Sequence, residues 1–169
     1  MRLTALETVA LWASLGASAS VLAADLTTGA GATIVLPLQV ARLADIEFGT
    51  LTPATTAERV TVTYDGRRTG TGPGMLVSAG AAPAGAALVV TGCPHSLFAI
   101  TLPESAILTS EGDGGEEMRV ADFTLSTGQV AVLQADGTQK VGIGATLYLG
   151  PMQAPGHYRG SFTVAVDYQ

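Results

Sequence analysis

The strongest constraint on the fold is an alternation of apolar and polar residues near the end of the chain. One run places every second side chain on a common apolar face: Val141, Ile143, Ala145, Leu147 and Leu149. A second run, over residues 158–168, repeats the pattern with Phe162, Val164, Val166 and Tyr168. Successive side chains of a β-strand point to opposite faces of the sheet, so this period of two predicts two half-buried strands.

Shorter runs of the same kind precede these two strands. They cover residues 33–40, 44–48, 59–64, 75–78, 86–92, 97–103 and 118–126. Turn residues separate them, and the 21 glycines of the chain favour short strands joined by tight turns over helices. About seven to nine short strands at this spacing predict an all-β fold, an immunoglobulin-like antiparallel β-sandwich.

Two of these segments carry more specific expectations. Pro37 has no N–H to donate to a ladder, which places the first strand, 33–40, at a sheet edge or at a bulge. In residues 59–64 the apolar phase places Val60, Val62 and Tyr64 on the inward face.

The segment 118–126 changes phase within its own length. Met118 and Val120 occupy even positions and would share one face of a regular strand, whereas Phe123 and Leu125 occupy odd positions and would fall on the opposite face. This slip predicts a β-bulge or bend near Ala121–Asp122. Across all strands, the larger apolar residues are expected to form the core between the two sheets. They are Phe48, Val62, Ile100, Phe123, Val141, Ile143, Leu147, Phe162, Val164 and Val166.

Residues 1–24 are expected to be a signal peptide that is removed by cleavage. Arg2 supplies a basic start, an apolar run covers 9–15, and small residues follow, with cleavage possible after Ala19, Ala23 or Ala24. The apolar run is too short for a bilayer span, which takes roughly 20 apolar residues. We therefore expect an exported protein, in the periplasm, at the cell surface or secreted, in which residues 25–169 form a single β-sandwich domain.

The charge balance excludes one class of partner. Eight Lys and Arg residues stand against 14 Asp and Glu residues, a net charge of −6. Such a chain has no basic patch to neutralise phosphates, so nucleic acid is not an expected partner. No segment after the leader is expected to cross a membrane as a helix.

Four segments in order resemble the bacterial domain of unknown function 4402 family. They are 44–51 (ADIEFGTL), 92–103 (GCPHSLFAITLP), 118–126 (MRVADFTLS) and 141–169, which closes with PGHYRGSFTVAVDYQ. The resemblance covers nearly the whole mature chain. It implies a small exported protein with an immunoglobulin-like sandwich and no assigned activity.

A looser resemblance is to pilin subunits of the chaperone–usher route, including the spore-coat-U-like subunits. Those proteins often end in an alternating strand with a penultimate aromatic residue, as Tyr168 is here. Most also carry an N-terminal donor strand that completes the neighbouring subunit. Here only a Gly- and Thr-rich stretch precedes residues 33–40. Either 33–40 is itself the donor, or the domain completes itself.

The side chains that could act as nucleophiles, general bases or metal ligands do not form a recognisable active site. Cys93 has His95 nearby but no third orienting group, and neither His95 nor His157 has the second ligand cluster that zinc requires. We expect no enzymatic activity and no cofactor, and we expect these three residues to be dispensable.

The acidic glycine-rich loop 111–117 is the one candidate metal site. Its candidate calcium ligands are Glu111, Asp113, Glu116 and Glu117. The loop lacks the ligand spacing of an EF-hand, so a solvated acidic loop is favoured over a calcium site.

Two functions of different classes fit these observations. The first is an exported cell-envelope or surface structural protein, a pilin-like or matrix and adhesive subunit that interacts through strand edges. Its interaction residues would be Phe162, Val164, Val166 and Tyr168, and its partners other copies of itself or a periplasmic chaperone and usher. The alternative is a soluble periplasmic or secreted module that binds calcium or a glycan through loops 65–74 and 111–117.

Overall fold

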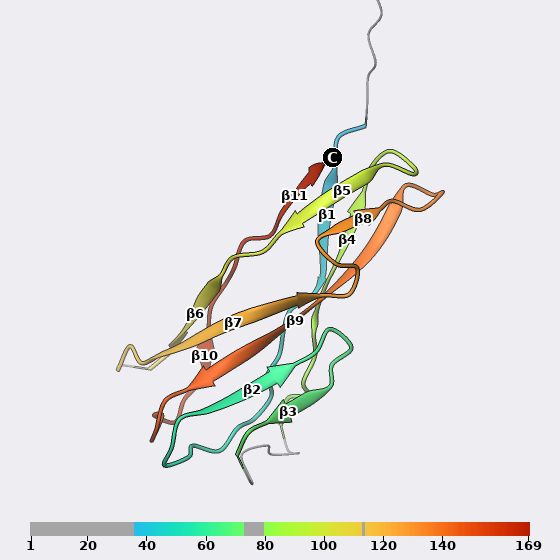
Figure 1. Cartoon of the computed structure of the whole chain (residues 1–169). Helices are drawn as coiled ribbons and strands as arrows, with labels where there is room; N and C mark the ends of the chain where they lie inside the picture. The colour runs from blue at the N-terminus through green and yellow to red at the C-terminus, as the bar shows by residue number, and fades with distance from the viewer. Residues whose placement is uncertain (1–35, 73–79, 113) are drawn as a thin grey trace, which may run out of the picture. The chain divides into compact units, whose positions relative to one another are not determined.

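The computed structural model describes residues 36–72, 80–112 and 114–169 (Figure 1). The expected leader, residues 1–24, and the expected strand at 75–78 lie outside the described residues. Across the described ranges the regular structure consists of eleven β-strands, so the all-β prediction is confirmed. The strands form two antiparallel sheets.

The larger sheet has the order β1-β4-β9-β7-β6-β10, and a hairpin of β2 and β3 joins it along β9. Its strands are β1 (Gln39–Ala44), β2 (Glu58–Val62), β3 (Arg68–Gly70), β4 (Ala86–Thr91), β6 (Ser105–Ser110), β7 (Glu117–Leu125), β9 (Thr138–Leu149) and β10 (Tyr158–Arg159). The smaller sheet has the order β11-β5-β8. Its strands are β5 (Leu97–Thr101), β8 (Val130–Val132) and β11 (Ala165–Tyr168).

The long strand β9 organises the core, because its two halves serve two different apolar clusters. Its first half pairs with β4, and there Val141 and Ile143 pack with Phe98 and Ile100 of the smaller sheet. Its second half pairs with β2, and there Leu147 packs with residues of β2 and β7 from the same, curled sheet. The structure is therefore a two-sheet sandwich at one end and a curled single sheet at the other.

The expected core residues all pack in these clusters, but to different depths. Six are buried: Phe48, Val62, Ile100, Val141, Ile143 and Leu147. Four are only half-buried against the core: Phe123, Phe162, Val164 and Val166. In addition, Phe48, Val62 and Leu147 belong to the cluster inside the curled sheet, so their predicted place between two sheets is corrected.

The expected single strand over residues 158–168 is wrong, because the chain changes sheets along it. Strand β10 pairs with β6 in the larger sheet and β11 pairs with β5 in the smaller one. Figure 1 shows β5–β6 and β10–β11 running side by side through this change. At the crossing a side chain at Gly160 would collide with the Ile107 carbonyl oxygen, so glycine permits the close approach.

Two other boundaries differ from the sequence prediction. Residues 33–35 of the expected strand 33–40 lie outside the described residues; of its described part, 36–38 are not in a strand and β1 covers Gln39–Ala44, at a sheet edge as Pro37 indicated. Tyr64 is 50% exposed instead of inward, because β2 ends at Val62 and the chain turns away. The turn is closed by a hydrogen bond from the Gly66 N–H to the Thr63 carbonyl.

The predicted bulge in β7 is confirmed. The register between β7 and β9 shifts between Ala121 and Thr124, and Asp122 has a φ of 52°, which is uncommon for a residue with a side chain. The Tyr148 hydroxyl of β9 donates a hydrogen bond to the Asp122 carboxylate. This bond raises the pKa of Tyr148, and desolvation and the negative charge of Asp122 act in the same direction.

Candidate functional site

The candidate site is the side of the sandwich where β1, at the edge of the larger sheet, faces β11, at the edge of the smaller one. We call this side the seam and define it by Leu36 to Ala44 and Phe162 to Tyr168. On β1, Val40 lies directly opposite Val90 and so shares its inward face. Val90 is fully buried whereas Val40 remains 47% exposed. The inner face of the larger sheet is therefore incompletely covered along β1.

The matching face of β11 is also incompletely covered. Phe162, Val164, Val166 and Tyr168 alternate with exposed residues and are all half-buried. The neighbouring β5 contributes Phe98 and Ile100 to the same cluster, and both are buried. Side-chain burial in this cluster thus falls from β5, in the middle of the smaller sheet, to β11 at its edge.

The ladder between β11 and β5 shows which peptide groups of β11 point outward. The Gln169 N–H donates to the Leu97 carbonyl, and residues of an antiparallel pair alternate in bonding across the ladder. Ala165 and Asp167 therefore bond toward β5, whereas the peptide groups of Val166 and Tyr168 face away from it. Among the described residues, β11 pairs with β5 alone.

Tyr168 joins the two edges at one end of the seam. Its hydroxyl donates to the Leu36 carbonyl at 2.8 Å and accepts from the Cys93 N–H at 2.7 Å. A Cβ at Gly92 would collide with this hydroxyl, so the glycine leaves the space that Tyr168 occupies. The penultimate tyrosine thus ties the last strand to the entry of the first strand and to the turn between β4 and β5.

Of the residues singled out for chemistry, Cys93 alone contacts the seam. Its thiol accepts a hydrogen bond from the Leu36 N–H at 3.2 Å. His95 and His157 are exposed residues in separate turns. The structure therefore gives Cys93 a structural role: it bonds to Leu36, just before β1, and to Tyr168, the last residue of β11.

The acidic loop presents its carboxylates to solvent. Glu111 forms an ion pair with Arg159 at 2.8 Å, and Glu116 and Glu117 are exposed, while Asp113 lies outside the described residues. Within the part of the chain that the structure describes, no cluster of three or more His, Cys, Asp or Glu side chains could hold a metal ion.

Sequence reasoning identified the β11 half of the seam and missed the β1 half. Placing the first strand at 33–40 hid the run QVARLA, in which Val40 and Leu43 are exposed apolar residues on an edge strand. The exposure of an edge depends on strand order, which a short alternating run does not specify.

The fold and the seam define a small all-β domain of two antiparallel sheets with incompletely covered edges. The family model described as Domain of unknown function (DUF4402) matches residues 38–168, and the chain belongs to this family. No curated protein and no solved structure matches the chain. No helix in the described ranges is long and apolar enough to cross a membrane.

Proposed function

We propose that the protein is an exported structural or adhesive subunit of the bacterial cell envelope, pilin-like in that it binds its partner through strand edges. In this proposal residues 1–24 direct export and are removed, and the mature domain acts without catalysis or cofactor. The partner is another copy of the chain or a periplasmic chaperone and usher system. The observation that carries the proposal is the seam between β1 and β11.

The seam offers the two features that an added strand needs. The outward peptide groups of Val166 and Tyr168 supply main-chain donors and acceptors, which give affinity in strand addition. The half-buried side chains of Phe162 and Val164 supply apolar surface that an incoming residue would cover. Burying apolar surface contributes about 25 cal/mol per Å², so an alternating apolar partner is favoured over a polar one.

Charged residues near the seam limit unspecific pairing. Arg42 of β1 forms an exposed ion pair with Asp45 at 2.9 Å, and Asp167 is exposed on β11. Charges on edge strands discourage indiscriminate edge-to-edge association. The same charges would favour a partner that complements them over one that merely aggregates.

Strand addition is tested by appending a short alternating apolar peptide to Gln169 through a flexible linker. We expect a marked rise in the melting temperature, and no rise for a linker that ends in a scrambled polar peptide. Val166→Pro removes an outward N–H while leaving the hydrogen bonds from Ala165 and Asp167 to β5 in place. The peptide should therefore stabilise this variant less than the parent. If it does not stabilise the parent, and the parent stays monomeric at all concentrations, the subunit role is wrong.

The alternative role, a module that binds calcium or a glycan, has weaker support. One of its candidate ligands, Glu111, is already paired with Arg159. Among the described residues, Glu116 and Glu117 do not converge with Glu111 on a metal site. A rise in melting temperature on adding calcium would favour this alternative over the subunit role.

A further inference from the structure

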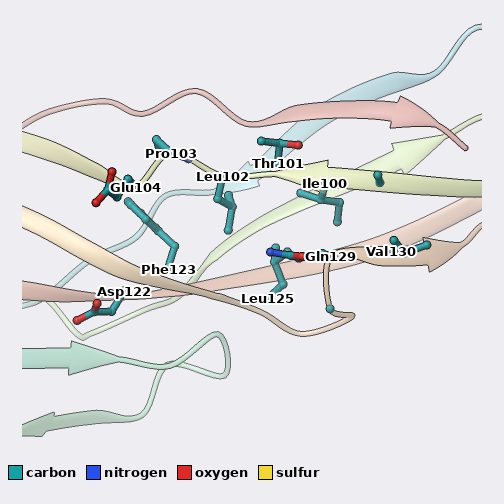
Figure 2. Close-up of a pocket in the computed structure, with 12 residues that line it drawn as sticks. Ile100, Thr101, Leu102, Pro103, Glu104, Asp122, Phe123, Leu125, Gln129 and Val130 are labelled. Atoms are coloured by element: carbon teal, nitrogen blue, oxygen red, sulfur yellow. The ribbon is translucent and has the colours of Figure 1, made fainter.

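A pocket of about 560 Å³ lies at the place where the chain passes from β5 to β6 and so changes sheets (Figure 2). One wall comes from Ala99 to Glu104, at the end of β5 and beyond it. The facing wall comes from Asp122, Phe123 and Leu125 of β7, and residues 128–130 close one end. This volume is in the range of sites that hold small ligands or a few residues of a peptide.

The pocket coincides with a strand position that neither sheet fills. Strand β6 pairs with β7 from Thr109 and Glu117 only as far as Ser105 and Ala121. Strand β8 accompanies β5 only as far as the hydrogen bond from the Ile100 N–H to the Gln129 carbonyl. Among the described residues, Leu102 on one wall and Leu125 on the other therefore have no strand partner on the pocket side.

The ladders indicate that the peptide groups of both leucines point into this vacant position. Ile100 bonds toward β8, and residues two apart along a strand point to the same side, so Leu102 does the same beyond the end of β8. Ser126 donates to the Gly142 carbonyl of β9, so Leu125, one residue earlier, directs its own N–H and carbonyl away from β9. The two walls thus offer main-chain hydrogen-bonding groups to the same gap.

The side chains of the pocket define what such a segment would carry. Ile100 and Leu102 extend toward Phe123 and Leu125, giving an apolar floor between the two walls (Figure 2). At the other end the pocket is lined by Glu104 and Asp122, and the described lining residues include no basic side chain. Both side chains are exposed, but Asp122 already accepts a hydrogen bond from the Tyr148 hydroxyl, so Glu104 is the carboxylate at the rim that we assign to a basic residue.

We propose that this pocket binds an extended peptide segment of a protein partner, with alternating apolar residues facing inward and a lysine or arginine between them. The apolar residues would cover Leu102 and Phe123, and the main chain would pair with Leu102 and Leu125. The basic residue would face Glu104. The pocket lies on a different side of β5 from the seam, although Val166 of the seam pairs with Ile100 of the pocket and Phe162 packs on Phe123.

The test is a titration of the full chain with an acetylated pentapeptide of the sequence Ser-Leu-Lys-Leu-Ser, followed by amide NMR. We expect saturable shifts of the Leu102 and Leu125 amide signals, and weaker binding of the peptide in which glutamate replaces lysine. Glu104→Gln should weaken the lysine peptide by about two- to fivefold, the range for an exposed ion pair. Glu116→Gln, an exposed carboxylate away from the pocket, should leave the affinity unchanged.

Two further variants distinguish binding in the pocket from binding at the seam and from loss of the fold. Val40→Ser alters the seam on β1, away from the pocket lining, and should leave this binding intact. Leu102→Ala should reduce the binding, with the melting temperature reporting whether that variant folds. The proposal is overturned if the peptide does not bind, if Glu104→Gln and the parent bind it equally, or if Val40→Ser abolishes binding. It is also overturned if lauric acid shifts these amides and the peptide does not, since the pocket would then be a site for small apolar molecules.

Discussion

At the scale of single residues, Tyr168 connects more of the molecule than its position near the chain end suggests. Its ring packs against the inter-sheet cluster, and its hydroxyl bonds to Leu36 and Cys93, which are distant from it in sequence. The sequence indicated a terminal aromatic residue on the apolar face. Its hydrogen-bond partners depend on how β1 and the turn after β4 come together, which no local pattern specifies.

Tyr168→Phe is expected to lower the free energy of unfolding by about 1–3 kcal/mol. The change keeps the ring and removes one hydroxyl, which leaves the Leu36 carbonyl and the Cys93 N–H without that partner. Urea unfolding would measure the loss. Tyr64→Phe is the matched control, because the Tyr64 ring is half exposed and should tolerate the change. Equal effects of the two substitutions would contradict the role given to Tyr168.

Cys93→Ser is expected to change the free energy of unfolding by no more than about 0.5 kcal/mol. A serine hydroxyl can accept the hydrogen bond that the Leu36 N–H gives to the thiol, and the backbone N–H that serves Tyr168 is unchanged. The same unfolding measurement applies. A loss of partner binding at unchanged stability would instead assign the thiol a functional role.

At the scale of elements, the terminal segment is divided between two sheets, and Phe162 lies in the stretch between them. Its ring packs on Phe123 with the centroids 4.9 Å apart, and Phe123 lies within the bulge in β7. The aromatic pair therefore joins the segment between β10 and β11, which changes sheets, to the bulged part of β7.

Phe162→Ala is expected to cost about 2 kcal/mol, below the 3–5 kcal/mol of a fully buried phenylalanine. The ring is only half-buried, so its removal exposes less apolar surface and leaves a smaller cavity. Chemical denaturation measures the cost, and Phe98→Ala, at a fully buried position in the same cluster, should cost more. If Phe162→Ala proved the more damaging of the two, the half-covered seam would be the wrong description.

Sequence patterns predicted the strands in which apolar and polar residues alternate regularly over many residues. The alternation from Val141 to Leu149 identified most of β9, and the slip after Val120 located the bulge. Strand β6 was missed because its apolar residues Ala106, Ile107 and Leu108 are consecutive, with Ile107 facing outward at 44% exposed. Strand β8 was missed because it is three residues long and only its middle residue is half-buried. The sheet change at Gly160 was missed because alternation continues through it while the ladder does not.

At the scale of the whole molecule, the apolar side chains are buried around β9 and only partly buried along the seam. The deepest residues cluster on β2, β4, β5 and β9, whereas every residue of β1 is exposed. The free energy of unfolding of a small domain is low, so a partner that covers this apolar edge would stabilise the folded state appreciably.

Export is the prediction that belongs to the intact protein in its cell. Mass spectrometry of the native protein should find a chain that begins between Ser20 and Asp25, because small residues precede each of these positions. A native chain that retains Met1 would contradict the envelope role, whatever the properties of the domain in isolation.

The central claim is that the seam accepts another strand, and amide hydrogen exchange tests it most directly. The outward amides of Val166 and Tyr168 should exchange readily in the free protein, whereas the amide of Gln169 is bonded to Leu97. Adding an alternating apolar peptide should slow exchange at Val166 and Tyr168, and a scrambled peptide should not. Unchanged exchange at both amides with saturating apolar peptide would contradict the account.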